Sequence, residues 1–141
     1  MKVLLKNVRL SFPSLFKTEQ YAGEDTEKYA ATFLIPKSDT KTVTAIEQAC
    51  KAALVEKYGE GKVPKGFKLP LVDGDDKEYQ GYADCVYIKA NTKKRPTLVN
   101  RDKTPIAEED SILYGGCYVN ASIDVWVMDN SYGKKVLASL N

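Results

Sequence analysis

Residues 117–128 read CYVNASIDVWVM, and this stretch decides the fold. The apolar side chains alternate strictly with the others, a period of two that is typical of a β-strand with one face on the core. The core-facing row comprises Cys117, Val119, Ala121, Ile123, Val125 and Val127. The opposite row comprises Tyr118, Asn120, Ser122, Asp124 and Trp126. We therefore expect a mainly β protein built around this long strand.

Four other segments are predicted to pair around it. Residues 3–16 form the first, with a core-facing row at Val3, Leu5, Val8, Leu10 and Phe12. Its rhythm slips at Lys6-Asn7, which predicts a bulge, and Pro13 should end regular pairing. The other three predicted strands cover residues 29–35, which Pro36 closes, residues 82–91, and residues 134–140 after a turn at 129–133.

Residues 39–58 are the one predicted helix. Its apolar stripe recurs at spacings of three and four and consists of Val43, Ile46, Ala49, Cys50, Ala53 and Leu54. Ser38 or Asp39 can cap the first turn, and Gly59 can close the last. Residues 18–27 and 60–80 are predicted loops, since both are rich in polar residues, glycine or proline.

The fold class predicted from these elements is an OB-like, five- to six-stranded antiparallel barrel with one amphipathic helix and long loops. At 141 residues the chain fits a single domain, residues 1–141. The usual OB fold has its helix between the third and fourth strands, whereas only two predicted strands precede the helix here.

Composition excludes several classes of protein. Histidine is absent, and the three cysteines, Cys50, Cys85 and Cys117, are far apart in sequence. We therefore expect buried reduced thiols, with no zinc site, no disulfide framework and no cofactor. No apolar run approaches the length of a membrane span, and the apolar stretch at the N-terminus is too short for a signal peptide, so we expect an intracellular protein.

Positive charge is concentrated in one segment, although the net charge of the chain is only +2. Residues 89–103 carry a net charge of +5 and all the other residues together carry −3. The basic residues of the segment are Lys89, Lys93, Lys94, Arg95, Arg101 and Lys103. Such a concentration is typical of a surface that meets a polyanion, although a solvated loop remains the alternative.

Aromatic side chains accompany this charge. Tyr87 lies beside Lys89 on the outward row of its strand, since Val86, Ile88 and Ala90 should face the core. Tyr118 and Trp126 lie on the outward row of the longest strand, while Tyr82 and Tyr114 fall at strand ends. Unpaired bases stack on such rings while cations neutralise the phosphates, so the expected ligand is a single-stranded nucleic acid.

The candidate binding residues follow from this pattern. Cations are expected to contact phosphates, with Arg9 as an additional contact and a charged hairpin around Arg101 closing over the strand. Tyr87, Tyr118 and Trp126 are expected to stack on bases, with Tyr82 and Tyr114 as weaker candidates. The full set is Arg9, Tyr82, Tyr87, Lys89, Lys93, Lys94, Arg95, Arg101, Lys103, Tyr114, Tyr118 and Trp126.

Enzymatic motifs are not apparent. The commonest general base is missing, and no phosphate-binding glycine motif is present. The acidic run at residues 73–78 fails the EF-hand pattern and reads as a polar turn or a weak cation site. A magnesium site that includes Asp84 and Asp124, the only acids inside clear strands, remains an alternative. The alternatives are therefore a metal-dependent nuclease, or a protein-interaction adaptor without affinity for nucleic acid.

Several ordered motifs resemble one phage and prophage family. They read KNVRLSFPSLF from residue 6, YAATFLIPK from residue 29, GY at residues 81–82, KKRPTLVNR from residue 93 and YGGCYVNA from residue 114. The resemblance covers nearly the whole chain. It implies an OB fold and sequence-independent binding of single-stranded DNA during phage replication, recombination or repair.

Further expectations follow from the same resemblance. It implies a non-enzymatic protein in the cytoplasm of the bacterial host, with replication or recombination proteins as partners and a homo-oligomer as one possible state. Phage proteins of this type often end in an acidic tail that recruits partners. This sequence ends in Ser139-Leu140-Asn141, which implies either that such a tail is missing here or that partners are recruited differently.

Overall fold

The structure, a computed structural model, describes residues 2–21, 23–63, 67, 69–76, 82–100, 104–107, 113–130 and 133–140. The barrel strands and their helix are β1 (Lys2–Ser14), β4 (Tyr29–Pro36), α1 (Thr40–Tyr58), β6 (Cys85–Thr92), β7 (Tyr118–Asn130) and β8 (Gly133–Leu140). Four short elements complete the order along the chain: β2 (Gln20–Tyr21), β3 (Glu24–Asp25), β5 (Leu71–Asp73) and the 3₁₀ turn η1 (Gly74–Asp76).

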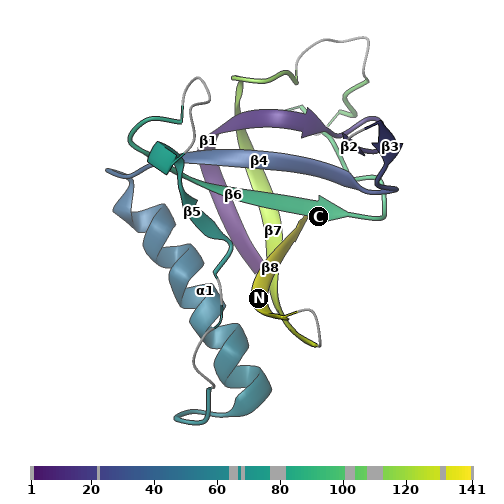
Figure 1. Cartoon of the computed structure of the whole chain (residues 1–141). Helices are drawn as coiled ribbons and strands as arrows, with labels where there is room; N and C mark the ends of the chain where they lie inside the picture. Colours follow the sequence, from purple (N-terminus) through teal and green to yellow (C-terminus); the bar gives the residue numbers. More distant parts are fainter. Residues whose placement is uncertain are drawn as a thin grey trace.

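Five strands close into a barrel (Figure 1). β1 lies between β4 and β7, β4 pairs with β6, and β7 pairs with β8, all antiparallel. A short parallel pairing of β6 with β8 completes the circuit, through Ala90–Ala138 and Asn91–Ser139. β5 adds to the other half of the same edge of β6. The expected OB-like barrel is therefore confirmed, with one of its pairings parallel rather than antiparallel.

The bulge predicted in the first strand is present. The register of β1 on β7 shifts between Leu5 and Val8, and Asn7 adopts φ 52°. The N–H of Asn7 leaves the ladder and donates to Asn120 Oδ1 at 2.8 Å. β1 bends there, so its two halves run in different directions in Figure 1. A second irregularity lies between Ser11 and Ser14, although the strand continues past Pro13.

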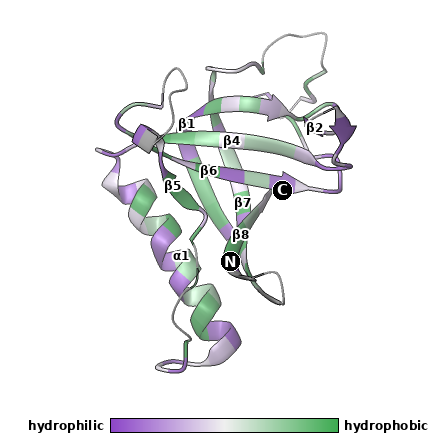
Figure 2. Ribbon diagram, viewed as in Figure 1, coloured by the Kyte–Doolittle hydropathy of each residue, from purple (hydrophilic) through white to green (hydrophobic). Residues whose placement is uncertain are grey.

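The barrel interior is filled by the predicted apolar rows. The fully buried side chains include Leu5 and Leu10 of β1, Ile35 of β4, Ile88 of β6 and Ile123 of β7. β4 is buried on both faces from Ala30 to Ile35, and Figure 2 shows it hydrophobic along most of its length. Its outward side chains therefore need a cover outside the barrel.

The helix α1 begins and ends at capping residues that were predicted, Asp39 and Gly59. Asp39 Oδ1 accepts the N–H of Thr42 at 3.3 Å, and Gly59, at φ 95°, donates its N–H to Val55 O at 2.7 Å. The apolar stripe packs against β1 and β7, where Ile46 and Cys50 join the core. The helix follows the second barrel strand, as the order of the predicted elements required.

Short strands were missed in both predicted loops. β2 and β3 pair within residues 18–27, and β5 and η1 lie within residues 60–80. The third predicted strand begins at Cys85 rather than Tyr82, because Asp84 adopts φ 57° and turns the chain. Two- and three-residue strands have too few positions to display a period of two, so only the fold reveals them.

The base of the predicted charged hairpin is present in the structure. Val99 bridges Pro105, Asn100 N–H donates to Thr104 O at 2.8 Å, and Ile106 N–H donates to Leu98 O at 3.0 Å. The tip, residues 101–103, lies outside the described residues.

The cysteines are all free thiols. Cys50 and Cys117 are buried, as expected, while Cys85 is half-buried. Burial raises the pKa of the Cys50 thiol to about 11. No helix in the described part of the chain is long and apolar enough to cross a membrane.

Candidate nucleic-acid interface

Strand register aligns one row of side chains across the outside of the barrel. Arg9 of β1 is paired with Tyr118 of β7 on one side and with Leu34 of β4 on the other. Leu34 is paired with Tyr87 of β6, which is paired with Val72 of β5. Paired residues project from the same face of a sheet, so this row sets two tyrosines on either side of a guanidinium. Tyr118 and Tyr87 are three strands apart, about 14 Å.

A second row runs parallel to the first. It consists of Ser11, Thr32 and Lys89, paired across β1, β4 and β6. We call the two rows together the outer face. Arg9, Tyr87, Lys89 and Tyr118 were predicted from separate segments of the sequence, and all four lie on the outer face.

Lys89 already has a partner on this face. Its Nζ lies 3.0 Å from Oε1 and 2.9 Å from Oε2 of Glu19. Glu19 is held in turn by its backbone, which donates to Lys28 O and accepts from Thr26 N, at 2.7 and 2.9 Å. The carboxylate therefore occupies the place beside Lys89 that a phosphate would take. Sequence reasoning missed Glu19, since nothing local links it to a lysine 70 residues away.

Tyr82 is a buried residue that packs outside the barrel, and its ring is not exposed. It is 3% exposed, and its hydroxyl is 2.8 Å from Ser11 Oγ. Its ring centroid lies 5.3 Å from that of Tyr87 and 6.4 Å from that of Phe12. The position at a strand end suggested exposure, but the turn at Asp84 folds this residue back onto the sheet. In this conformation Tyr82 supports the neighbouring rings and offers no free face to a base.

Phe12 departs most from the sequence analysis. The period of two assigned it to the core-facing row of β1, yet it is 59% exposed. It adopts φ 45°, and the register of β1 shifts beside it, which turns the ring outward next to Tyr82. A left-handed backbone costs a bulky residue about 1–2 kcal/mol, and an exposed ring recovers only part of the free energy that full burial would give. Phe12 is therefore an exposed ring beside the outer face that the sequence did not predict.

The turn before β7 lies beside Arg9. Gly116 N–H donates to Leu10 O at 2.7 Å, and Arg9 Nε donates to Gly116 O at 3.3 Å. Gly116 has φ 104°, a conformation that favours glycine. Tyr114, in the same turn, is 59% exposed. The predicted Tyr114 and Tyr118 are thus each two residues from Gly116, where Arg9 is anchored.

The other predicted residues belong to neither row of the outer face or lie outside the described residues. Lys93, Lys94 and Arg95 are exposed directly after β6 ends. Arg101 and Lys103 lie outside the described residues.

Trp126 is separated from Tyr118 by eight residues of β7, about 26 Å along the strand. Its Nε1 donates to Ser139 Oγ at 2.9 Å. Ser139 is paired in turn with Asn91 of β6, between Lys89 and Lys93 in the chain. Trp126 is therefore distant from Tyr118 along β7, but only β8 separates it from the end of β6.

The acidic turn forms ion pairs with a lysine of the same chain. Lys37 Nζ lies 2.9 Å from Asp73 Oδ1 and 2.6 Å from Asp75 Oδ2. Asp75 Oδ1 also accepts the N–H of Asp84 at 2.9 Å. These hydrogen bonds, above all those from Lys37, hold the pKa of Asp73 and Asp75 below the usual range. No group of three histidine, cysteine or acidic side chains that would suit a metal ion occurs among the residues that the structure describes.

Comparisons with known proteins show the family to which the sequence is similar. The family described as "Enterobacter phage Enc34, ssDNA-binding protein" matches residues 1–141. A relative, "Putative protein p50" of Acyrthosiphon pisum secondary endosymbiont phage 1, is 42% identical over 99% of this chain and 80% of its own length. The family match is to single-stranded DNA-binding proteins, which are not enzymes.

Solved structures give the same result. The single-stranded DNA-binding protein from bacteriophage Enc34 in complex with ssDNA has a TM-score of 0.82 and 27% identity, over 99% of this chain and 82% of that one. The gp2.5 single-stranded DNA-binding protein of bacteriophage T7, 15% identical with a TM-score of 0.58 over 99% of this chain and 87% of that one, shares the fold.

Proposed function

Because the chain belongs to the Enterobacter phage Enc34 ssDNA-binding protein family, we propose that it binds single-stranded DNA, without sequence preference, across its outer face. The observation that carries this proposal is the row in which Tyr118, Arg9 and Tyr87 are paired in register. We further propose that it acts in phage DNA replication, recombination or repair, in the cytoplasm of the bacterial host. Partner proteins and a homo-oligomer stay predictions.

The mechanism combines two kinds of contact. Arg9, Lys89 and the exposed cations at residues 93–95 neutralise phosphates, which gives affinity for any sequence. Tyr118, Phe12 and Tyr87 offer ring surface for stacking, which every base can use at about 1–3 kcal/mol. Tyr82 holds Phe12 and Tyr87 in place from below. Trp126 can contact a strand that crosses β8 from the end of β6, since its partner Ser139 is paired with Asn91.

Fluorescence anisotropy with labelled oligo-dT, the matching RNA and a duplex, at two salt concentrations, tests this proposal. We expect binding to oligo-dT that weakens with salt by a slope of about −0.7 per phosphate contact. Changing Lys93, Lys94 and Arg95 to alanine should reduce the slope, while Lys51→Ala on the exposed side of α1 should not. Binding with no salt dependence, or cleavage of the strand once Mg²⁺ is added, would contradict the proposal.

A further inference from the structure

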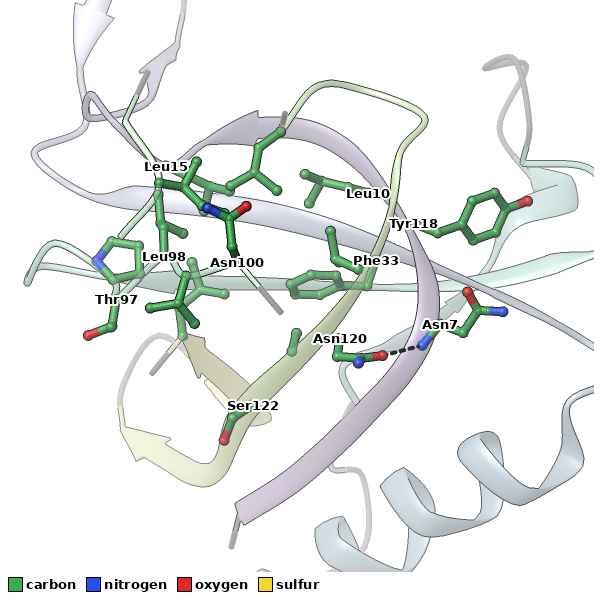
Figure 3. A pocket seen from close by; sticks show the side chains of 17 residues that line it. Asn7, Leu10, Leu15, Phe33, Thr97, Leu98, Asn100, Tyr118, Asn120 and Ser122 are labelled. Atoms are coloured by element: carbon green, nitrogen blue, oxygen red, sulfur yellow. Dashed lines mark hydrogen bonds between the residues drawn. The ribbon is translucent and has the colours of Figure 1, made fainter. Parts of the chain in front are cut away.

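A cavity of about 670 Å³ opens between the barrel and the segment that follows β6 (Figure 3). Its walls are largely apolar. Leu10, Phe33 and Val119 line it from β1, β4 and β7, and Leu98 and Ile106 line it from the base of the charged hairpin. The volume lies within the range of about 300–1,000 Å³ that is typical of small-ligand sites.

Two amides from different segments line this cavity, and existing hydrogen bonds orient both. Asn100, from the hairpin, uses its Nδ2 to donate to Thr104 Oγ1 at 3.1 Å. Asn120, from β7, uses its Oδ1 to accept from Asn7 N at 2.8 Å, as the dashed line in Figure 3 marks. Within the described part of the chain this leaves Asn100 Oδ1 as an acceptor and Asn120 Nδ2 as a donor for a ligand. A flat apolar ring with donors and acceptors on its edge, such as a nucleobase, suits this arrangement.

The surroundings of the cavity suit a nucleotide of a longer strand. Pro96 lines the cavity, and the exposed Lys93, Lys94 and Arg95 directly precede it in the chain. Tyr118 lines the cavity as well and also belongs to the outer face. A strand that leaves the outer face at Tyr118 thus meets an apolar cavity with cations beside its wall.

We propose that the cavity receives one nucleobase of the bound strand, turned away from its neighbours, while cations at residues 93–95 contact the adjacent phosphates. The inference rests on the proposed function and adds a second mode of base contact, by enclosure rather than by stacking on a surface. In a single strand no base pair has to open for a base to turn out, so the cost is only that of unstacking.

The test compares two labelled strands of equal length, oligo-dT and a strand in which every nucleotide is abasic. Leu98→Trp fills the cavity from the hairpin and Ala121→Leu fills it from β7. Each variant should lower the preference for oligo-dT over the abasic strand on the order of ten-fold, the contribution of one base. The salt slope should stay the same, because the phosphate contacts remain.

Gln48→Trp, on the exposed side of α1, is the matched control for an added indole and should leave the preference unchanged. Melting temperatures establish that each variant is folded, and two variants from opposite walls guard against a local distortion. If both folded variants keep the full preference, or lose affinity for both strands equally, the base does not enter the cavity and the inference fails. If the unaltered protein binds neither strand, the proposed function itself fails.

Discussion

At the scale of single residues, Phe12 combines two unfavourable features, a left-handed backbone and an exposed ring. Neither feature helps the barrel to fold. Each is explained if the ring stacks on a base, since strained residues persist where a binding role keeps them. A substitution at Phe12 should therefore be able to lower affinity for DNA without lowering the stability of the fold.

Phe12→Asn is the substitution that should change affinity but not stability. Asparagine tolerates the left-handed conformation, so the gain from relieved strain should offset the lost contact with Tyr82, and stability should change by less than about 1 kcal/mol. Affinity for oligo-dT should fall by about 1–3 kcal/mol. The measurements are urea unfolding and anisotropy. Leu4→Asn removes an equally exposed apolar side chain from β1 and should leave affinity unchanged; an equal loss there would refute a specific role for Phe12.

Glu19 is the second residue with a separable effect. Its carboxylate neutralises Lys89 on the outer face, so an incoming phosphate must displace it. Glu19→Gln should therefore tighten binding and steepen the salt slope by up to about 0.7, the equivalent of one more phosphate contact. Glu47→Gln removes the same charge from the exposed side of α1. If the two variants behave alike, the gain comes from net charge and not from the release of Lys89.

At the scale of elements, η1 docks beneath the turn that carries Tyr82. Gly74 is buried, and a Cβ on it would lie 2.4 Å from Tyr82 O and 2.6 Å from Cys85 O. Both are backbone atoms and cannot move without shifting the turn. Gly74→Ala should therefore destabilise the fold by about 1–3 kcal/mol, as overpacking does.

Urea unfolding measures this loss. Gly115→Ala is the control, because the nearest atom to its Cβ would be Pro13 Cδ at 4.0 Å. The Gly74 variant should also weaken binding, since Tyr82 supports Phe12 and Tyr87. Full affinity in a destabilised Gly74 variant would show that this support is dispensable.

The ion pairs between Lys37 and β5–η1 make a pH-dependent contribution. The pKa of Asp73 and of Asp75 is lowered in the folded state, so the stability they add is present above the ordinary carboxyl pKa of about 4. It is lost as the pH falls through the lowered values. Lys37→Met should thus reduce the unfolding free energy at pH 7 slightly, and the difference between the two proteins should shrink only as the pH falls below about 4, towards the lowered pKa values. Parallel curves across this range would contradict the assignment. Both carboxylates are exposed, so the difference will be small.

At the scale of the whole molecule, periodicity predicted the elements that are long enough to display it. The row in residues 117–128 and the stripe in residues 39–58 predicted β7 and α1, and the slip at Lys6-Asn7 predicted the bulge of β1. The features that were missed depend on contacts distant in sequence. The pairing of Glu19 with Lys89 and the burial of Tyr82 are visible only once the barrel has closed.

For the candidate site, the sequence predicted the residues in regular stretches of strand but not those where the backbone is irregular. Arg9 was selected as a cation on the first strand. The parity of positions along a strand predicted that Tyr87, Lys89 and Tyr118 face outward, and all three lie on the outer face. It failed for Phe12, where one positive φ reverses the parity. It also took no account of the eight positions of β7, about 26 Å, that separate Trp126 from Tyr118.

The parallel pairing of β6 with β8 has a consequence for biosynthesis. β8 is the last barrel strand in chain order, and β1 gains its second neighbour only when β7 appears. Until the ribosome has made both, the nascent chain carries β1 and β6 with unpaired edges, which invite association with other chains. Translation that stalls before residue 118 should therefore produce fragments that aggregate rather than partial barrels.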